Sequence, residues 1–191
     1  MRPIMGCVEP AAGLEGFFDG AEQLVADHGP SPVDFARVGD LLRMVAAERT
    51  LLDESRMAAL HHSSAQATIL GHGPHGSTLM LARFSAEAPT PVHNHNSWGV
   101  LCVIRGRDRH ILWARQDDGS AAGRAQLRII QTRELGPGDV AWFPDVPGDI
   151  HSQQGIGEAA WELVYFGRDP MALPRLYFDP ERGRVEERAA V

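Results

Sequence analysis

The sequence predicts an all-β sandwich or barrel preceded by an N-terminal helical segment. Up to about residue 62, apolar residues recur at the spacing of an amphipathic helix. From about residue 66, short β-like runs alternate with turns rich in glycine and proline. About eight such runs, spaced roughly 8–12 residues apart and with no helical stretch between them, are typical of a sandwich or barrel.

Three helices are expected in the N-terminal segment. The first carries Phe17 and Leu24, and the second carries apolar residues from Val33 to Val45. Ser31 and Pro32, followed by Asp34, form a helix start signal for the second helix. A third, short helix is expected at Glu54–Leu60. Because helices this short cannot bury their apolar faces alone, residues 1–65 are predicted to be a helical cap packed on the barrel.

The barrel is predicted to occupy residues 66–181. Residues 182–191 are charged and are expected to form a loose C-terminal tail. The expected strands are Ala67–Leu70, Ser77–Ala86, Trp98–Ile104, Asp108–Arg115, Gln126–Glu134, Asp139–Phe143, Asp149–Gln153 and Trp161–Gly167.

Composition excludes several classes of function. The chain has 191 residues, 43% of them hydrophobic, which is enough for one domain with a core, and its net charge is −7. This acidic balance disfavours partners such as nucleic acid or an anionic membrane. All 18 basic residues are arginine, so mechanisms that need a lysine, such as Schiff-base chemistry, are excluded.

The two cysteines, Cys7 and Cys102, are too few for a disulfide framework or a four-cysteine zinc site. No run approaches 18 consecutive apolar residues, and the start of the chain lacks a basic leader followed by an apolar run. We therefore expect a soluble, cytoplasmic protein.

Two of the nine histidines stand out. His93 and His95 form a His-x-His pair after a proline-bounded turn, and on an extended chain both imidazoles project from the same face. Neutral imidazole is the commonest metal ligand in proteins. The pair therefore indicates a metal site. We interpret six of the other histidines, His28, His61, His62, His72, His75 and His110, as surface or structural residues.

His151 gains a role from the pattern around it. The stretch TPVHNHNSWGVLCVIRG is followed downstream by GPGDVAWFPDVPGDIH, in which Gly138, Pro144 and Gly148 precede His151. Together these stretches resemble the two motifs of the cupin superfamily, whose fold is a double-stranded β-helix, or jelly roll. The resemblance implies that His93, His95 and His151 bind a metal ion. The position of the family's usual glutamate ligand is occupied here by Gly99.

Further stretches resemble the cysteine dioxygenase-like cupins, chiefly their bacterial members. Trp98-Gly99, PGDIH at 147–151 and LVYFG at 163–167 carry this resemblance, which covers about residues 66–168. Members of that group use Fe(II) and O2 to oxidise a thiol to a sulfinic acid. The resemblance implies that Tyr165 is an active-site tyrosine.

The sequence departs from that group in two places. The group has a Ser-x-His-x-Tyr relay, but Trp161 and Leu163 stand at the serine and histidine positions. The arginine that would clamp a substrate carboxylate is also missing from its usual early strand, near Gln66. Arg83, Arg105 and Arg168 are the alternatives for that clamp. We expect Arg83 and Trp98 to border the substrate pocket.

These observations predict a mononuclear non-haem Fe(II) dioxygenase that acts with O2 on a small thiol or another metal-chelating substrate. Zinc, manganese and nickel are alternative metals for three histidines. Three neutral ligands leave the full charge of a divalent ion, which favours an anionic co-ligand such as a thiolate or enolate. A zinc or manganese cupin hydrolase or isomerase, and a non-catalytic cupin that binds a small molecule, are the alternative functions. The oligomeric state stays open, with a homodimer as one alternative.

Overall fold

The computed structural model describes residues 13–26, 30–48, 54–61 and 66–189. Cys7, His28 and His62 lie outside the described residues, as does the side chain of His61. Within the described part, no helix is long and apolar enough to cross a membrane.

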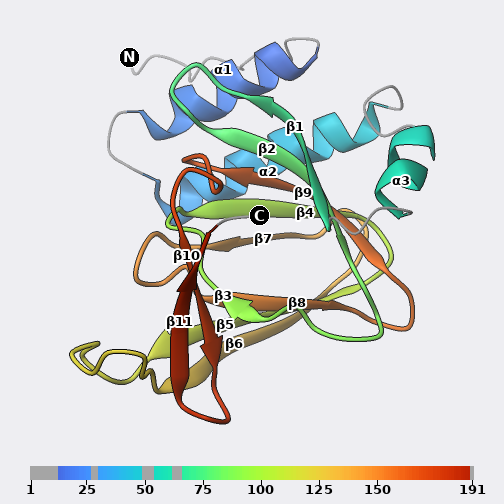
Figure 1. The fold of residues 1–191 in the computed structure, drawn as a ribbon. Helices are drawn as coiled ribbons and strands as arrows, with labels where there is room; N and C mark the ends of the chain where they lie inside the picture. Colours follow the sequence, from blue (N-terminus) through green and yellow to red (C-terminus); the bar gives the residue numbers. More distant parts are fainter. Residues whose placement is uncertain (1–12, 27–29, 49–53, 62–65, 190–191) are drawn as a thin grey trace.

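The N-terminal segment forms the three expected helices, α1 (Leu14–Val25), α2 (Pro32–Ala47) and α3 (Glu54–His61). The helix start signal before α2 is a capping box. The Ser31 hydroxyl accepts a hydrogen bond from the Asp34 backbone N–H at 3.3 Å, and the Ser31 N–H donates to the Asp34 carboxylate at 3.0 Å. Helices α1 and α2 lie against one face of a β-sheet (Figure 1).

Eight strands form a jelly roll, because they pair as a series of nested antiparallel hairpins. Strand β5 pairs with β6, β4 with β7, β3 with β8 and β2 with β9. The strands are β2 (Thr78–Phe84), β3 (Val92–His93), β4 (Gly99–Arg105), β5 (Asp108–Arg115), β6 (Leu127–Leu135), β7 (Val140–Phe143), β8 (His151–Gly155) and β9 (Ala160–Phe166). The predicted two-sheet jelly-roll fold with N-terminal helices is therefore confirmed.

Three more strands extend the two sheets. Strand β1 (Ala67–His72) completes a five-stranded sheet in the order β1-β2-β9-β4-β7. Strands β10 (Arg175–Asp179) and β11 (Arg184–Arg188) complete a six-stranded sheet in the order β11-β10-β3-β8-β5-β6. The two sheets face each other (Figure 1).

The C-terminal region differs from its prediction. We predicted a loose tail at 182–191, but Arg184–Arg188 forms β11 and pairs with β10 over its full length. Gly183 has a φ of 60°, which suits the tight turn between these strands. The charged residues of β11 are mostly exposed, so their polarity is compatible with an edge strand.

The three central strands of the five-stranded sheet, β2, β9 and β4, bury both of their faces. On β9, Leu163 and Tyr165 belong to the core beneath the helices, whereas Val164 and Phe166 belong to the core between the two sheets. Strand β2 divides in the same way, with Leu79 and Leu81 towards the helices. This near-continuous apolar character follows from the helical cap, because an uncapped sheet face would carry polar side chains.

A buried polar cluster joins the two sheets. The Gln153 amide on β8 donates to Glu162 on β9 at 2.8 Å and to Asp108 on β5 at 3.3 Å. Both carboxyl groups are fully buried. Burial raises the pKa of Asp108 to about 6, and burial together with the charge of Asp108 raises the pKa of Glu162 well above its usual value.

This cluster predicts a specific pH dependence of stability. A carboxyl whose folded pKa is raised binds more protons in the folded state, so its burial costs stability as the pH rises above the pKa of the unfolded chain. The variant Glu162→Gln should therefore gain stability over the wild type at pH 8, by roughly 1–3 kcal/mol, and much less at pH 5. Urea unfolding at both pH values measures this difference.

The matched control for that experiment is Glu187→Gln, which changes an exposed glutamate on β11. Its difference from the wild type should be the same at both pH values. If the free energy of unfolding of Glu162→Gln differed from that of the wild type by the same amount at pH 5 and at pH 8, the buried Glu162 carboxyl would not be the group that binds a proton over this range.

Candidate metal centre

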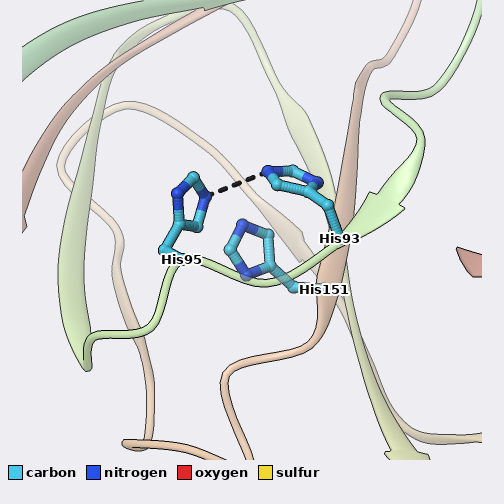
Figure 2. Close-up of side chains that lie close together, drawn as sticks. All are labelled: His93, His95 and His151. Atoms are coloured by element: carbon cyan, nitrogen blue, oxygen red, sulfur yellow. Dashed lines mark hydrogen bonds between the residues drawn. The ribbon is translucent and has the colours of Figure 1, made fainter. Parts of the chain in front are cut away.

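Three imidazoles converge between the two sheets (Figure 2). His93 ends β3, His95 follows it after one residue, and His151 begins β8. Because β3 and β8 pair with His93 opposite His151, the fold brings the late histidine to the early pair. One ring nitrogen from each side chain lies within 4.8 Å of the others. The structure therefore brings together the three metal ligands that the sequence predicts.

Hydrogen bonds to the backbone orient two of these rings. His93 Nδ1 lies 2.8 Å from the carbonyl oxygen of Pro91, and His151 Nδ1 lies 3.1 Å from that of Asp149. A carbonyl oxygen can only accept, so each Nδ1 carries the proton. The Nε2 lone pairs of His93 and His151 are thereby left free for a ligand-binding role.

The geometry of the cluster fits a divalent transition metal. Metal–nitrogen distances are about 2.0–2.1 Å, so two imidazole nitrogens bound to one ion at a right or tetrahedral angle lie about 2.8–3.4 Å apart. His93 Nε2 and His95 Nε2 are 3.0 Å apart. His95 Nδ1 is buried without a partner in the described part of the chain, so the described hydrogen bond of that ring is the contact of its Nε2 with His93 Nε2.

The electrostatics of the cluster keep the imidazoles neutral. Burial, more than any other cause, lowers the pKa of His93 to about 4, and the positive charge of Arg175 contributes. The pKa values of His95 and His151 are lowered well below the usual value, first by burial and then by the neighbouring imidazoles. A neutral imidazole offers its lone pair to a metal at pH 7 without first releasing a proton.

The loop that carries His95 is held by side chains from other elements. Asp149 accepts hydrogen bonds from the backbone N–H groups of His95 at 3.1 Å and Asn96 at 2.8 Å. Asn96 has a φ of 57°, and its amide donates to the Pro174 carbonyl at 2.8 Å. Asp149 thus fixes the backbone of a ligand and not its ring.

Gly99 leaves no room for a fourth protein ligand. A Cβ atom at this position would lie 2.2 Å from the ring of Phe143, its register partner on β7. The Phe143 ring itself stacks near His151, with ring centroids 4.5 Å apart. Phe143 therefore fills the space that a glutamate at position 99 would need, and the ion would keep positions open towards the cavity.

A cavity of about 850 Å³ opens beside the three imidazoles. One of its walls comes from the inner face of the five-stranded sheet and is mainly apolar, with Gln66 and Thr68 as its polar residues. The other comes from the six-stranded sheet and holds the three histidines with polar neighbours. Its lining residues are Gln66, Ala67, Thr68, Ile69, Met80, Ala82, Phe84, Thr90, Pro91, His93, His95, His151, Gln153, Val164, Phe166, Met171, Arg175 and Tyr177.

Arg175 and Tyr177, on β10, are cavity residues that sequence reasoning missed. Tyr177 pairs with His93 across the strands and stacks on its ring at 5.8 Å. The Arg175 side chain is buried and donates from Nε to the Pro170 carbonyl at 3.2 Å and from Nη2 to the Met171 sulfur at 3.0 Å. The sequence signal for β10 is the alternating run PRLYFDP, which follows a proline-rich loop. This run lies outside the strands that the sequence analysis expects.

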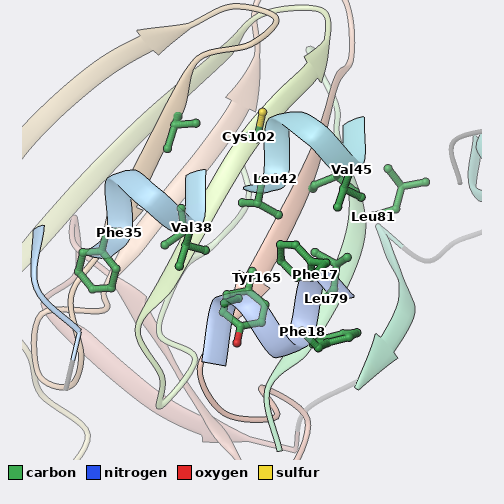
Figure 3. Close-up of a cluster of buried hydrophobic side chains, with 14 of the residues drawn as sticks. Phe17, Phe18, Phe35, Val38, Leu42, Val45, Leu79, Leu81, Cys102 and Tyr165 are labelled. Atoms are coloured by element: carbon green, nitrogen blue, oxygen red, sulfur yellow. The ribbon is translucent and has the colours of Figure 1, made fainter. Parts of the chain in front are cut away.

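Tyr165, which the sequence assigned to the active site, does not line the cavity. Its side chain lies in the core beneath the helices and packs against Phe17 at 5.2 Å and Trp98 at 5.7 Å (Figure 3). The cause is the alternation of side chains along β9. Val164 and Phe166 face the cavity, so Tyr165 between them faces the opposite side of the sheet.

The two residues expected to border the pocket also lie elsewhere. Trp98 is buried against Phe35 on α2, with ring centroids 5.4 Å apart. Arg83 alternates with Ala82 and Phe84 on β2, both of which line the cavity, so its guanidinium lies on the other face near Trp161. The helical cap decides this outcome, because it covers the face that these residues occupy.

His110 is a buried neighbour of the cluster. Its ring lies 5.6 Å from that of His151, and neither of its nitrogens has a partner among the described residues. It stands on β5 opposite Gln153 in the register. The alternation of Asp108, His110 and Leu112 along one strand is the only sequence signal for this position.

No family model matches the sequence, and no curated protein matches it. Among solved structures, the chain is similar to an oxalate oxidase, at 18% identity over 56% of this chain and 53% of that chain, with a TM-score of 0.42. It is also similar to a mutant of Bacillus subtilis oxalate decarboxylase, at 23% identity over 50% of this chain and 22% of that chain, with a TM-score of 0.37. A cupin 2 conserved barrel domain protein from Salinispora arenicola gives 16% identity over 52% and 72%, with a TM-score of 0.37.

The chain thus spans about half the length of the oxalate oxidase and less of the decarboxylase. Likeness at this level carries no information about the reaction, because one fold hosts many activities. The function has to be argued from the residues that surround the three histidines.

Removing one imidazole should remove the metal. His151→Ala deletes the ligand that β8 supplies, so we expect the purified variant to hold less than a tenth of the wild-type metal after reconstitution with Fe(II) without oxygen, measured by elemental analysis. His72→Ala is the matched control, because His72 is exposed on β1 and bonds Thr78 at 3.1 Å. Equal metal content in both variants would contradict the site.

The contact between Gly99 and Phe143 makes a second prediction. Gly99→Ala should destabilise the protein by about 1–3 kcal/mol, because the new methyl group overlaps a buried ring. Adding Phe143→Leu should recover part of that loss, since the smaller side chain yields space. Urea unfolding of the two single variants and the double variant measures the coupling, and strictly additive effects would show that the two side chains do not compete.

Proposed function

We propose that this protein is a mononuclear non-haem Fe(II) dioxygenase that acts with O2 on a small anionic substrate able to bind the metal. A thiol is the nearest precedent for such a substrate. The observation that carries the proposal is a site of three neutral imidazoles, without a carboxylate ligand, beside a cavity whose lining contains Arg175 and no acidic residue in the described chain.

Charge balance favours an anionic substrate. Three neutral ligands leave a divalent ion with its whole charge, and Arg175 adds another positive charge close enough to lower the pKa values of all three histidines. Among the described residues, no carboxylate lies within 4.0 Å of this guanidinium. An anion that enters the cavity would therefore compensate two positive charges in a site of low dielectric.

Arg175 is suited to bind that anion. Its two described hydrogen bonds are donated by Nε and Nη2, and they fix the plane of the guanidinium. Further N–H groups of the guanidinium remain to donate to a ligand. Burial lowers its pKa, while the neighbouring Tyr177 side chain and the negative charge of Asp169 raise it. This residue takes the place of the clamp that the sequence lacks near Gln66.

The lack of a base in the cavity favours oxygen chemistry over hydrolysis or isomerisation. Hydrolases and isomerases commonly use a side chain, such as a carboxylate or a histidine, that takes a proton from water or from carbon. In the described lining of the cavity, the only histidines belong to the three-histidine cluster, and no aspartate or glutamate is present. A bound Fe(II) ion would supply the electron transfer that couples O2 to an anionic substrate, for which no such base is required.

The test is oxygen consumption by the iron-loaded protein. After reconstitution with Fe(II) without oxygen, a panel of small thiols and 1,3-diketones should include a compound that stimulates O2 uptake at an electrode. The reactive compound should carry a negative charge, and Arg175→Gln should raise its KM at least about 10-fold, because a charged hydrogen bond is lost. Arg105→Gln, which changes an exposed arginine on β4, is the control.

Two results would overturn the proposal. One is zinc as the metal of the isolated protein, with turnover that proceeds equally well without O2, which would indicate a hydrolase or isomerase. The other is saturable binding of a panel compound under air with no O2 uptake and no product, which would indicate a binding protein.

A further inference from the structure

We infer that the ligand of this cavity is an amphipathic anion, with its charged head at Arg175 and the histidines and an extended apolar body along the five-stranded sheet. This inference rests on the proposed function only for the placement of the head. A compact thiol of a few atoms would satisfy the metal and Arg175 and leave most of the cavity empty. The size and the lining of the remaining space determine what else the ligand must carry.

The cavity is large for a small thiol. Its volume of about 850 Å³ lies in the upper part of the range of about 300–1,000 Å³ in which proteins hold drug-sized ligands. Sites of that size bury most of the ligand surface, so their lining reflects the chemistry of the ligand.

The part of the cavity wall that β2 and β9 form, opposite the histidines, is apolar. Alternate residues of β2 (Met80, Ala82 and Phe84) and of β9 (Val164 and Phe166) supply it, and all five are buried. A polar or charged ligand group against this wall would lose its hydrogen bonds to water without replacement. The part of the ligand that contacts β2 and β9 should therefore be hydrocarbon or aromatic.

The polar groups deeper in the cavity are already paired. The Gln153 side-chain amide donates hydrogen bonds to Glu162 and Asp108. The Thr90 hydroxyl oxygen accepts a hydrogen bond from the backbone N–H of Gln153 at 3.0 Å. Neither side chain therefore requires a ligand partner. Arg175 is different, because a buried cation that forms no ion pair with a carboxylate of the described chain is stabilised by an anionic ligand. Arg175 is the one charged residue in the described lining, so the requirement for a charged ligand group is confined to its end of the cavity.

The apolar wall continues to the surface at β1. Ile69 lines the cavity and is 42% exposed, and β1 is the edge strand of its sheet. A large apolar side chain in this exposed position adjoins Met80, its register partner on β2. The apolar track therefore runs from the interior to the rim, and it allows the body of the ligand to extend towards solvent.

The experiment compares three probes on the full chain loaded with Zn(II), which does not react with O2. The probes are octanoate, acetate and octanamide, and isothermal titration calorimetry measures their dissociation constants. Octanoate should bind at least about 30-fold more tightly than acetate, because it adds six methylene groups of apolar surface. It should also bind at least about 10-fold more tightly than octanamide, which keeps the chain and loses the charge.

Variants assign the two halves of the ligand to the two ends of the cavity. Arg175→Gln should bring octanoate to the affinity of octanamide, and Arg105→Gln should leave it unchanged. Ala82→Trp should weaken octanoate at least about 10-fold and leave zinc content and acetate binding unchanged. Ile69→Glu, at an exposed position that tolerates a charge, should weaken octanoate as well and serves if the tryptophan variant fails to fold.

Equal affinity for octanoate and acetate, or for octanoate and octanamide, would overturn the inference. So would Ala82→Trp and Ile69→Glu variants that both bind octanoate like the wild type. These outcomes are independent of the oxygen assay. A protein that binds octanoate as described and consumes no O2 with any panel compound would keep the inference and lose the proposed dioxygenase activity.

Discussion

The site depends on one backbone pairing, that of β3 with β8, which sets His93 opposite His151. These residues are far apart in the sequence, and only the nesting of hairpins from β5–β6 outwards to β2–β9 brings their strands together. A slip of one residue in this register would turn one imidazole to the other face of the sheet. The same pairing continues to β10, which places Tyr177 beside His93. The metal ligands and one wall of the cavity are thus consequences of a single register.

Burial determines the chemistry of the imidazoles that this register assembles. Desolvation lowers all three pKa values, so the rings are neutral ligands at pH 7. The same burial removes the Arg175 guanidinium from water, and among the described residues no carboxylate forms an ion pair with it. An anionic ligand would therefore stabilise this charge. A site with neutral ligands, a nearby cation and no acidic lining is electrostatically complementary to anions. We regard this complementarity as the main determinant of which molecules the cavity accepts.

Rigid support surrounds the ligands. Asp149 holds the backbone at His95 and Asn96, and Asn94 bonds the backbone of β10 at Leu176. On the opposite side, Phe143 occupies the space next to Gly99. The loop and the ring together fix which directions around an ion are closed by protein. The three histidines border the cavity, to which β2 and β9 contribute apolar side chains.

The sequence by itself determined the helices, the order of most strands and the identity of the three histidines. Local signals suffice for these features, such as the capping box at Ser31 and the period of two in Asp108–Arg115, and the spacing of His93 and His95 places both on one side of an extended chain. The pattern of glycines and prolines before His151 indicated a resemblance that joined the third histidine to the pair. Each of these inferences needs only neighbouring residues or a motif.

The tertiary structure decided which face of each strand lines the cavity and which distant strand completes it. Tyr165 and Val164 are adjacent and both are buried, so no pattern of hydrophobicity could show that the helices cover one and the cavity adjoins the other. The local sequence around Arg83 and Arg175 likewise does not show which of the two guanidinium groups reaches the cavity. Arg175 reaches the site because β10 pairs with β3, and Arg83 is excluded because it lies on the helix-covered side of β2. Side-chain alternation is a local property, but the choice of the inner face depends on packing between elements that are remote in the chain.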